Sequence, residues 1–190
     1  AGIGGTGVST LSGILVMAAH IDGIAGQAVN QTGLSQKNGG VTSQVRLSRD
    51  QSLSLRMARV PSQAASLLIG CDGVVAANDL TLTCLHKTKT TAILNASLDP
   101  VGVDGVGFGT IVSDDVVLNR LGAVMDTQHI HQINASELAN QLFDSTTTSG
   151  IILLGWALQK SHIPINVTSI EAALRLNAVD VEQNIAALQW

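Results

Sequence analysis

Aromatic and charged residues are scarce in this sequence. Phe and Trp together make up 2% of its 190 residues, Tyr is absent, and charged residues make up 13%. The formal net charge is −4, and the sequence contains no run of Lys and Arg. Proteins that bind nucleic acids use a cationic surface and often aromatic faces on which bases stack. The sequence therefore predicts no nucleic-acid partner.

Cysteines and long apolar runs are also lacking. Two cysteines, Cys71 and Cys84, are too few for a disulfide scaffold or for ligating an iron–sulfur cluster alone. We expect two buried thiols in a reducing compartment, and hence a cytoplasmic location. No apolar run approaches the roughly 20 residues that a membrane span needs, and the first residues lack the cationic start of a signal peptide. We therefore expect no membrane partner.

The most distinctive motif present is the start of the chain, Ala-Gly-Ile-Gly-Gly-Thr-Gly. Gly2, Gly4 and Gly7 have the G-x-G-x-x-G spacing, and Gly5 and Thr6 lie between them. A helical pattern over residues 8–20 follows directly. Glycines permit a tight turn with positive φ, and a helix N-terminus presents N–H groups that attract anions. The motif alone leaves two alternatives open, a bound phosphate and a tight structural turn.

The apolar pattern predicts one α/β domain over residues 1–190. The glycine turn, the helix over 8–20 and a strand over 24–30 form a βαβ opening, which favours a parallel sheet. Such a turn follows a strand, so we expect the chain to be an excerpt of a longer one, with its first strand trimmed or just upstream. Further predicted strands cover 41–47, 74–77, 91–96 and 122–126. Further predicted helices cover 62–70, 79–86 with Asn78 as N-cap, and 116–121.

The last third of the chain reads as helical. Asn134 and Glu137 have capping-box spacing, as do Thr168 and Glu171. Gly155 lies in the apolar helix predicted over 151–160, where it allows close packing, and a final helix is predicted over 181–190. The predicted architecture is a three-layer α/β/α domain with a mainly parallel Rossmann-like sheet and a helical C-terminal third.

A second unusual stretch covers residues 31–40, Gln-Thr-Gly-Leu-Ser-Gln-Lys-Asn-Gly-Gly. Ser35, Gln36 and Lys37 offer three hydrogen-bonding groups after a predicted strand, at the edge where open α/β sheets bind ligands. We favour a functional loop over an ordinary surface loop. Residues 99–115 hold four glycines with little periodicity, and we expect a long mobile loop there.

No residue is predicted to be catalytic or to bind a metal. His129 and His131 would share one face of a strand, as a metal pair requires, but no third ligand is evident. A dinucleotide-binding dehydrogenase needs an acidic residue at the end of its second strand. Asp22 has the required spacing but precedes that strand, which ends at Asn30 and Gln31. An NAD site is therefore disfavoured.

Three motifs occur together in this chain. The first is the turn Gly-x-Gly-Gly-x-Gly, with Thr6 at a position that often holds Gln. The second comprises Ser35, Gln36, Lys37, Gly39 and Gly40. The third comprises Leu153, Leu154, Gly155, Gln159, Lys160, Leu176, Asn177 and Val179. The combination resembles the gamma-type domain of 2-oxoacid:ferredoxin oxidoreductases, especially indolepyruvate:ferredoxin oxidoreductases. Gly150 stands where the family pattern has Asn.

The resemblance implies oxidative decarboxylation of a 2-oxo acid, indolepyruvate or another aryl-pyruvate. It implies thiamine diphosphate and iron–sulfur clusters on other domains, ferredoxin as electron acceptor and coenzyme A as a co-substrate. This segment, inactive alone and binding no cofactor alone, would belong to an oligomer. Its two loops would close on the active site or on the coenzyme's phosphates, through Gly2, Gly4, Gly5, Thr6, Gly7, Ser35, Gln36 and Lys37. The alternatives are an NAD- or FAD-binding module and an architectural domain.

Overall fold

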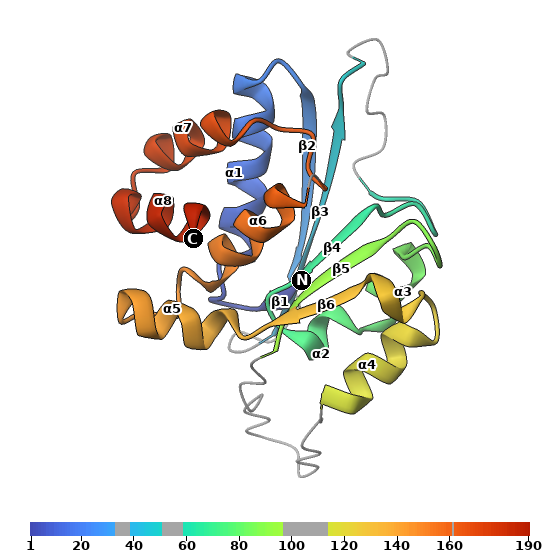
Figure 1. The fold of residues 1–190 in the computed structure, drawn as a ribbon. Coiled ribbons are helices and arrows are strands. Elements are labelled where there is room, and N and C mark those ends of the chain that lie inside the picture. Colours follow the sequence, from blue (N-terminus) through green and yellow to red (C-terminus); the bar gives the residue numbers. More distant parts are fainter. Residues whose placement is uncertain (33–38, 51–58, 97–113, 161) are drawn as a thin grey trace.

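The computed structural model describes residues 1–32, 39–50, 59–96, 114–160 and 162–190 (Figure 1). The strands of these residues form two three-stranded sheets. The first has the order β1-β3-β2 and is antiparallel, with β1 (Gly2–Ile3), β2 (Ala25–Thr32) and β3 (Gly40–Ser48). The second has the order β4-β5-β6 and is parallel, with β4 (Leu67–Gly70), β5 (Thr91–Asn95) and β6 (Ile130–Ile133).

Ala1 joins the edges of the two sheets. Its nitrogen donates to the Ile69 carbonyl oxygen at 2.8 Å, and the Cys71 N–H donates to the Ala1 carbonyl oxygen at 2.8 Å. This is the bonding pattern of neighbouring parallel strands. Away from this junction β3 and β4 diverge, as Figure 1 shows. The strands therefore follow one another as β2-β3-β1-β4-β5-β6, and Ala1 supplies backbone bonds between the halves.

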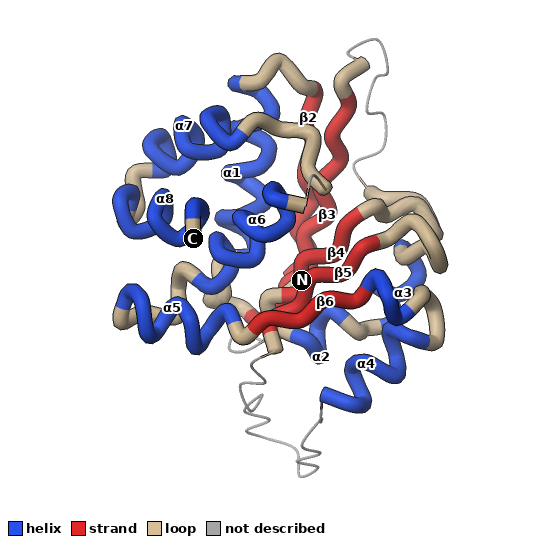
Figure 2. Tube along the Cα trace, viewed as in Figure 1, coloured by secondary structure: helices blue, strands red, loops and turns tan. Residues whose placement is uncertain are grey.

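Helices cover both faces of this arrangement (Figures 1 and 2). One layer comprises α1 (Val8–Ile21), α5 (Ala135–Phe143), α6 (Ser149–Gln159), α7 (Val167–Asn177) and α8 (Val181–Gln189). The other layer comprises α2 (Gly73–Ala76), α3 (Asp79–Cys84) and α4 (Asp114–Gly122). A short 3-10 turn, Thr127–His129, leads into β6. The α/β class, the layered architecture and the helical C-terminal third are confirmed.

The core lies on both sides of β5. All five of its residues are buried. Ile93 packs under the layer of α1 and α6, whereas Leu94 packs under the layer of α2 and α4. A strand buried on both faces reads as a continuous apolar run, which is why Thr91–Asn95 lacks the alternation of β3.

Two glycines permit close contact between helices. A Cβ on Gly155 would lie directly against the carbonyl oxygen of Leu188, so α6 and α8 meet backbone to backbone there. The prediction that Gly155 allows close packing is confirmed. A Cβ on Gly150 would lie 2.8 Å from Leu11 Cδ1. A larger residue at position 150 would therefore displace the end of the Leu11 side chain between α6 and α1.

The prediction of a mainly parallel sheet is wrong for the first half. β2 and β3 form a long antiparallel hairpin, pairing from Ala25 with Ser48 to Thr32 with Val41. β3 therefore lies between β1 and β2, and only the β4-β5-β6 half is parallel. The residue patterns of the strands predicted over 24–30 and 41–47 fit a parallel and an antiparallel pairing equally well, because periodicity does not reveal strand direction.

Four local predictions are also wrong. Residues 62–70, predicted as a helix, end in the strand β4, and residues 74–77, predicted as a strand, lie in and just after the short helix α2. No strand forms over residues 122–126, and the strand in this part of the chain is β6, which begins at Ile130. The capping box at Thr168 does not form, because α7 begins at Val167 with Asn166 as N-cap. Short apolar runs do not distinguish a buried strand from a helical turn.

The remaining elements agree with prediction to within a few residues at each end. They include the helix over 8–20 and the strands over 41–47 and 91–96. The caps at Asn78 and Asn134 form, each side-chain oxygen accepting from the backbone N–H three residues later. Most of the loop predicted over 99–115 lies outside the described residues, and its end, Asp114 and Asp115, begins α4.

Candidate functional site

Several chain segments meet where β1, β4, β5 and β6 end, which we call the carboxyl edge. The glycine turn over residues 2–7 leaves β1 there, and Gly39 leads into β3 beside it. Asp72 follows β4, Asn95 ends β5, and Ser136 lies in the first turn of α5. In open α/β sheets this edge is where ligands bind. The carboxyl edge is therefore the candidate functional site.

The glycine turn is held in one shape by its own bonds. The Thr6 N–H and hydroxyl both donate to the Ile3 carbonyl oxygen, at 3.1 and 2.7 Å. Gly5 and Gly7 have φ of 100° and 76°, a region that disfavours other residues. A Cβ on Gly2 would lie 2.5 Å from Thr6 Oγ1. These bonds fix the shape of the turn, and the Thr6 hydroxyl donates its hydrogen bond within the turn.

The turn delivers the chain into the N-terminus of α1. Gly7, the N-cap, has no side chain that could bond the first-turn N–H groups, and the first turn holds no acidic residue. Unpaired N–H groups and the positive end of the helix dipole favour an anion. The turn and the start of α1 thus have the chemistry of a phosphate or carboxylate site.

The second predicted loop is bonded to the first. The Gly4 N–H donates to the Gly39 carbonyl oxygen at 2.9 Å, and Ile3 pairs with Gly40. The structure thus brings together Gly2, Gly4, Gly5, Thr6, Gly7, Gly39 and Gly40. Ser35, Gln36 and Lys37 lie outside the described residues, so their predicted role stays a prediction.

The sequence analysis missed a buried polar cluster at the same edge. The Asn95 Nδ2 donates to the Ser136 Oγ at 2.8 Å and to the Cys71 carbonyl oxygen at 3.3 Å. The Ser136 N–H donates back to the Asn95 Oδ1 at 3.3 Å. Asp72, also buried, accepts from the Val75 N–H at 2.8 Å and caps α2. Two features of the sequence could have indicated this cluster: the polar residue Asn95 at the end of an apolar strand, and Asp72 directly before Gly73.

Burial raises the pKa of the Cys71 thiol at this edge. The thiol is therefore neutral near pH 7 and acts as a small apolar group. Among the described residues, no three His, Cys, Asp or Glu side chains lie close enough to hold a metal ion. His129 ends the 3-10 turn, whereas His131 lies in β6 with its ring 5.8 Å from that of Trp156.

The arrangement disfavours a dinucleotide site. β3 and Gly39 occupy the space beside the glycine turn, where β2 would lie in a dinucleotide-binding sheet. Asp22 lies at the far end of α1, where it accepts hydrogen bonds from Asn166 and Ser169. These hydrogen bonds lower the pKa of Asp22, and the bond from the Asn166 backbone N–H has the largest effect. Asn30, near the end of β2, offers an amide instead of a carboxylate, and its Oδ1 accepts from Ser12 and Ser43.

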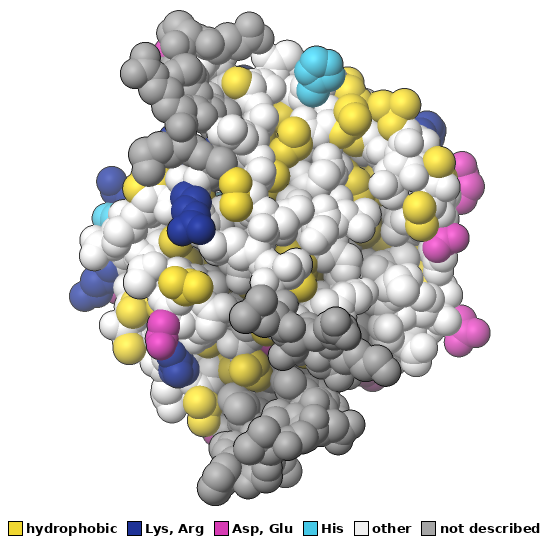
Figure 3. Space-filling model, turned by 180° about the vertical axis from the view of Figure 1, so that it is seen from behind, with side chains coloured by type: hydrophobic (Ala, Val, Ile, Leu, Met, Phe, Trp, Pro, Cys, Tyr) yellow, Lys and Arg dark blue, Asp and Glu magenta, His cyan; other side chains and the backbone are white. Residues whose placement is uncertain are grey.

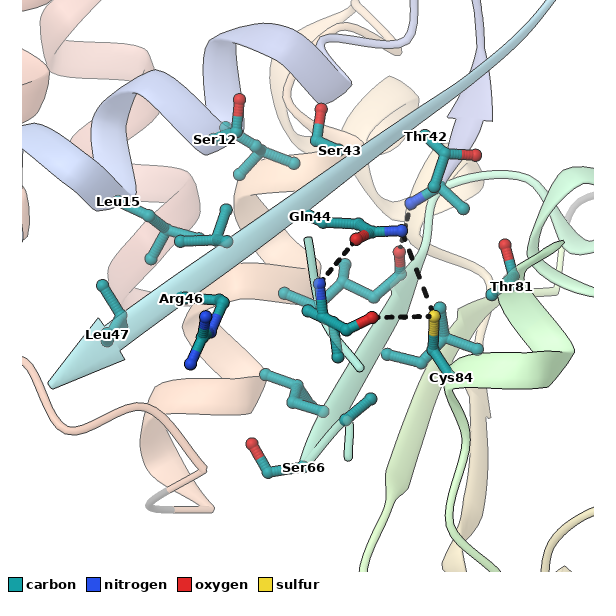
Figure 4. Close-up of a pocket in the computed structure, with 18 of the residues that line it drawn as sticks. Ser12, Leu15, Thr42, Ser43, Gln44, Arg46, Leu47, Ser66, Thr81 and Cys84 are labelled. Atoms are coloured by element: carbon teal, nitrogen blue, oxygen red, sulfur yellow. Dashed lines mark hydrogen bonds between the residues drawn. The ribbon is translucent and has the colours of Figure 1, made fainter. Parts of the chain in front are cut away.

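A cavity of about 450 Å³ lies between β3 and β4 (Figure 4). It begins at Ala1 and runs away from the carboxyl edge along β3. The Gln44 Oε1 accepts from the Val60 N–H at 2.7 Å, and its Nε2 is 4.0 Å from the Cys84 Sγ. His162 also lines the cavity, and burial lowers its pKa. The cavity contains none of the predicted site residues.

On the face in Figure 3, the Lys and Arg side chains of the described residues are scattered and do not form one patch. None of the helices in the described ranges is long and apolar enough to cross a membrane.

Comparison with known proteins agrees with the resemblance seen in the motifs. The family model described as pyruvate ferredoxin/flavodoxin oxidoreductase matches residues 1–189. Indolepyruvate oxidoreductase subunit IorB of Archaeoglobus fulgidus is 26% identical over 191 residues, covering 99% of this chain and 89% of that protein.

Three solved structures have the same fold. Pyruvate oxidoreductase subunit PORC of Thermotoga maritima matches with a TM-score of 0.68 and 16% identity, over 99% of this chain and 89% of that chain. The gamma subunit of a keto/oxoacid ferredoxin oxidoreductase of Geobacter sulfurreducens matches with a TM-score of 0.61 and 18% identity, over 99% of this chain and 90% of that chain. The 2-oxoglutarate:ferredoxin oxidoreductase of Magnetococcus marinus was solved with 2-oxoglutarate, coenzyme A and succinyl-CoA. It matches with a TM-score of 0.66 and 15% identity, over 98% of this chain and 28% of that chain. This chain therefore belongs to the pyruvate ferredoxin/flavodoxin oxidoreductase family, as a domain or subunit of a 2-oxoacid:ferredoxin oxidoreductase.

Proposed function

We propose that this chain completes the active site or the coenzyme A surface of an oxidoreductase that decarboxylates indolepyruvate or another aryl-pyruvate. The observation that carries the proposal is the hydrogen bond from the Gly4 N–H to the Gly39 carbonyl oxygen. It fixes Gly39, which follows Ser35, Gln36 and Lys37 in the sequence, against the glycine turn. In the proposal, Lys37 acts electrostatically, whereas Ser35 and Gln36 form hydrogen bonds.

The substrate class is proposed from the likeness to the indolepyruvate oxidoreductase subunit. Coenzyme A is proposed as co-substrate because a structural relative was solved with coenzyme A and succinyl-CoA. The residues at the carboxyl edge fit its phosphates. The start of α1 favours an anion, and Gly5 and Gly7 have open space that permits close backbone approach.

An iron–sulfur cluster does not fit the cysteines of this sequence. An iron–sulfur cluster needs about four thiolates, whereas the sequence has two cysteines and one of them is buried as a neutral thiol. We therefore place the clusters, and thiamine diphosphate with them, on other domains or subunits. Those subunits are the proposed partners in a cytoplasmic oligomer, and ferredoxin is the proposed electron acceptor of the whole enzyme.

The decisive experiment replaces Lys37 in the assembled enzyme. Lys37→Ala should raise the KM for coenzyme A or for the 2-oxo acid by about tenfold, the effect of removing one charge-assisted bond worth about 1.4 kcal/mol. Lys89→Ala is the matched control, because Lys89 is an exposed lysine in the turn before β5. Unchanged kinetics for every substrate would exclude a role for Lys37.

A titration distinguishes this proposal from a dinucleotide-binding module and from an architectural domain. Coenzyme A, NAD and FAD would each be added to the assembled enzyme and to a Gly5→Val variant, and binding would be measured by calorimetry. Gly5 has φ of 100° with open space around it, so valine would strain the turn without filling a contact. Weaker coenzyme A binding by the variant supports the proposal. Binding of NAD or FAD at this turn favours the first alternative, and no effect on any ligand favours the second.

A further inference from the structure

The turn between α7 and α8, which we call the α7–α8 turn (residues 175–180), exposes two large apolar side chains. All six of its residues are exposed, and the exposed fractions of Leu176 and Val179 are 65% and 56%. The turn lies on the side of the molecule away from the strands (Figure 1), so neither residue belongs to the carboxyl edge. Apolar side chains that are exposed close together favour an interaction surface.

The backbone of the α7–α8 turn adopts a conformation that most side chains disfavour. Ala178 and Asp180 have φ of 56° and 40°, in the left-handed region, and Ala178 ends α7 where glycine is usual. These two residues lie on either side of Val179. Residues held in this region cluster at functional segments, because the surrounding structure must stabilise them there. The conformation therefore favours a functional role for the turn over a simple connection.

Hydrogen bonds hold the α7–α8 turn in this one shape. The Ala178 N–H donates to the Leu174 carbonyl oxygen at 3.3 Å. The Asn184 Nδ2 donates to the Val179 carbonyl oxygen at 2.9 Å, and the Asn184 N–H donates to the Asp180 carbonyl oxygen at 2.9 Å. A surface that is fixed before binding loses little conformational entropy when a partner docks. The two apolar side chains are thus presented on a preorganised projection.

The charge around the α7–α8 turn is mainly acidic. Residues 167–190 contain the acidic side chains Glu171, Asp180 and Glu182, and the basic side chain Arg175. Within the described residues, neither Asp180 nor Glu182 forms a salt bridge. On the face in Figure 3, acidic side chains lie along the right-hand side, which carries the C-terminal helices. A partner with Lys or Arg around an apolar pocket would complement both the charge and the apolar side chains.

We propose that the α7–α8 turn is a docking surface for another domain or subunit of the same oxidoreductase, one that presents an apolar pocket bordered by Lys or Arg. Leu176 and Val179 fill the pocket, whereas Asp180 and Glu182 attract and orient the basic border. The inference rests on the proposed function in one respect, that this chain works within an assembled enzyme. It adds a contact at a place separate from the carboxyl edge.

The test places the photo-reactive residue benzoylphenylalanine at Val179 of the purified, assembled enzyme and, separately, at Leu80. Leu80 is the matched control, because it is 68% exposed on α3 in the other helical layer. On illumination, position 179 should cross-link to a peptide outside residues 1–190 that contains Lys or Arg, with a yield about tenfold above that of position 80. Equal yields at the two positions, or no cross-link from position 179, would overturn the proposal. A cross-link to residues 1–190 of a second copy would also overturn it.

A second measurement tests the charge of the partner. With the photo-reactive group at position 179, Glu182→Lys should lower the cross-link yield by about tenfold, because repulsion replaces attraction. Asp115→Lys is the matched control and should leave the yield unchanged, since Asp115 is likewise an exposed acidic residue in the first turn of a helix, α4. Equal yields for the two variants would overturn the proposal. A cross-link from position 179 combined with unchanged kinetics of Lys37→Ala would support this surface while excluding the proposed role of Lys37.

Discussion

The two half-sheets of this domain are built from different kinds of strand. In β4-β5-β6 the central strand is buried throughout, and its side chains enter the core on both faces. In β1-β3-β2 the residues of the hairpin are mostly half-buried, and polar side chains such as Gln27 and Gln44 occur along it. The parallel half therefore contributes more buried side chains to the core than the antiparallel half, which supplies β3 and Gly39 beside the glycine turn. The candidate site draws on both halves, because Asp72 and Asn95 lie at the ends of β4 and β5 in the parallel half.

The largest expected effect contrasts matched leucines in the two halves. Leu94 in β5 is fully buried, whereas Leu47 in β3 is partly buried and lines the cavity. Leu94→Ala should lower the free energy of unfolding by about 4 kcal/mol, because it leaves a void in a close-packed core. Leu47→Ala should lower it by about 1 kcal/mol. Denaturant unfolding of both variants measures the difference. Equal losses of unfolding free energy would contradict the contrast between the two half-sheets.

The next effect concerns the helical layer that covers both halves. Gly155→Ala should destabilise the domain by about 2 kcal/mol, because its Cβ would meet the backbone of α8. Gly13→Ala is the matched control, since Gly13 is an exposed helical glycine of α1 with open space around its Cβ position. That change should stabilise by about 0.5–1 kcal/mol through helix propensity. Thermal unfolding would show the opposite signs, and a destabilised Gly13→Ala would refute the explanation.

The smallest effect concerns the hydrogen bonds of Asp22, at the end of α1, with Asn166 and Ser169 at the start of α7, which we call the clasp. Hydrogen bonds from Asn166 and Ser169 lower the pKa of Asp22 in the folded protein. The stability that they contribute is therefore present above the ordinary aspartate pKa of about 3.9, and is lost as the pH falls through the lower, folded value. Asp22→Asn should flatten this part of the stability curve below pH 4. Unfolding of both proteins between pH 2 and 7 tests it, and superimposable pH dependences would show that the clasp contributes nothing.

Features with a local cause could be predicted from the sequence. The α1 pattern, the caps at Asn78 and Asn134, and the close contact at Gly155 all follow from neighbouring residues or from the size of one side chain. The candidate site was also partly predictable, because the glycine turn and Gly39 were both identified and lie in contact.

Features set by distant partners could not be predicted. The direction of β3 depends on its pairing with β1 and β2, and the run Leu67–Gly70 becomes a strand because β5 lies beside it. The N-terminus of α7 is held by Asp22, 144 positions away, in place of the local Thr168 box. Asn95 and Ser136 meet across 41 positions for the same reason.

The junction at Ala1 has a mechanical consequence. Its two backbone bonds join the half-sheets at one end of β3 and β4, and the two strands diverge away from the glycine turn. A tilt of the hairpin about that junction would leave Gly4 and Gly39 nearly in place. The candidate site thus lies beside the point about which the hairpin would turn.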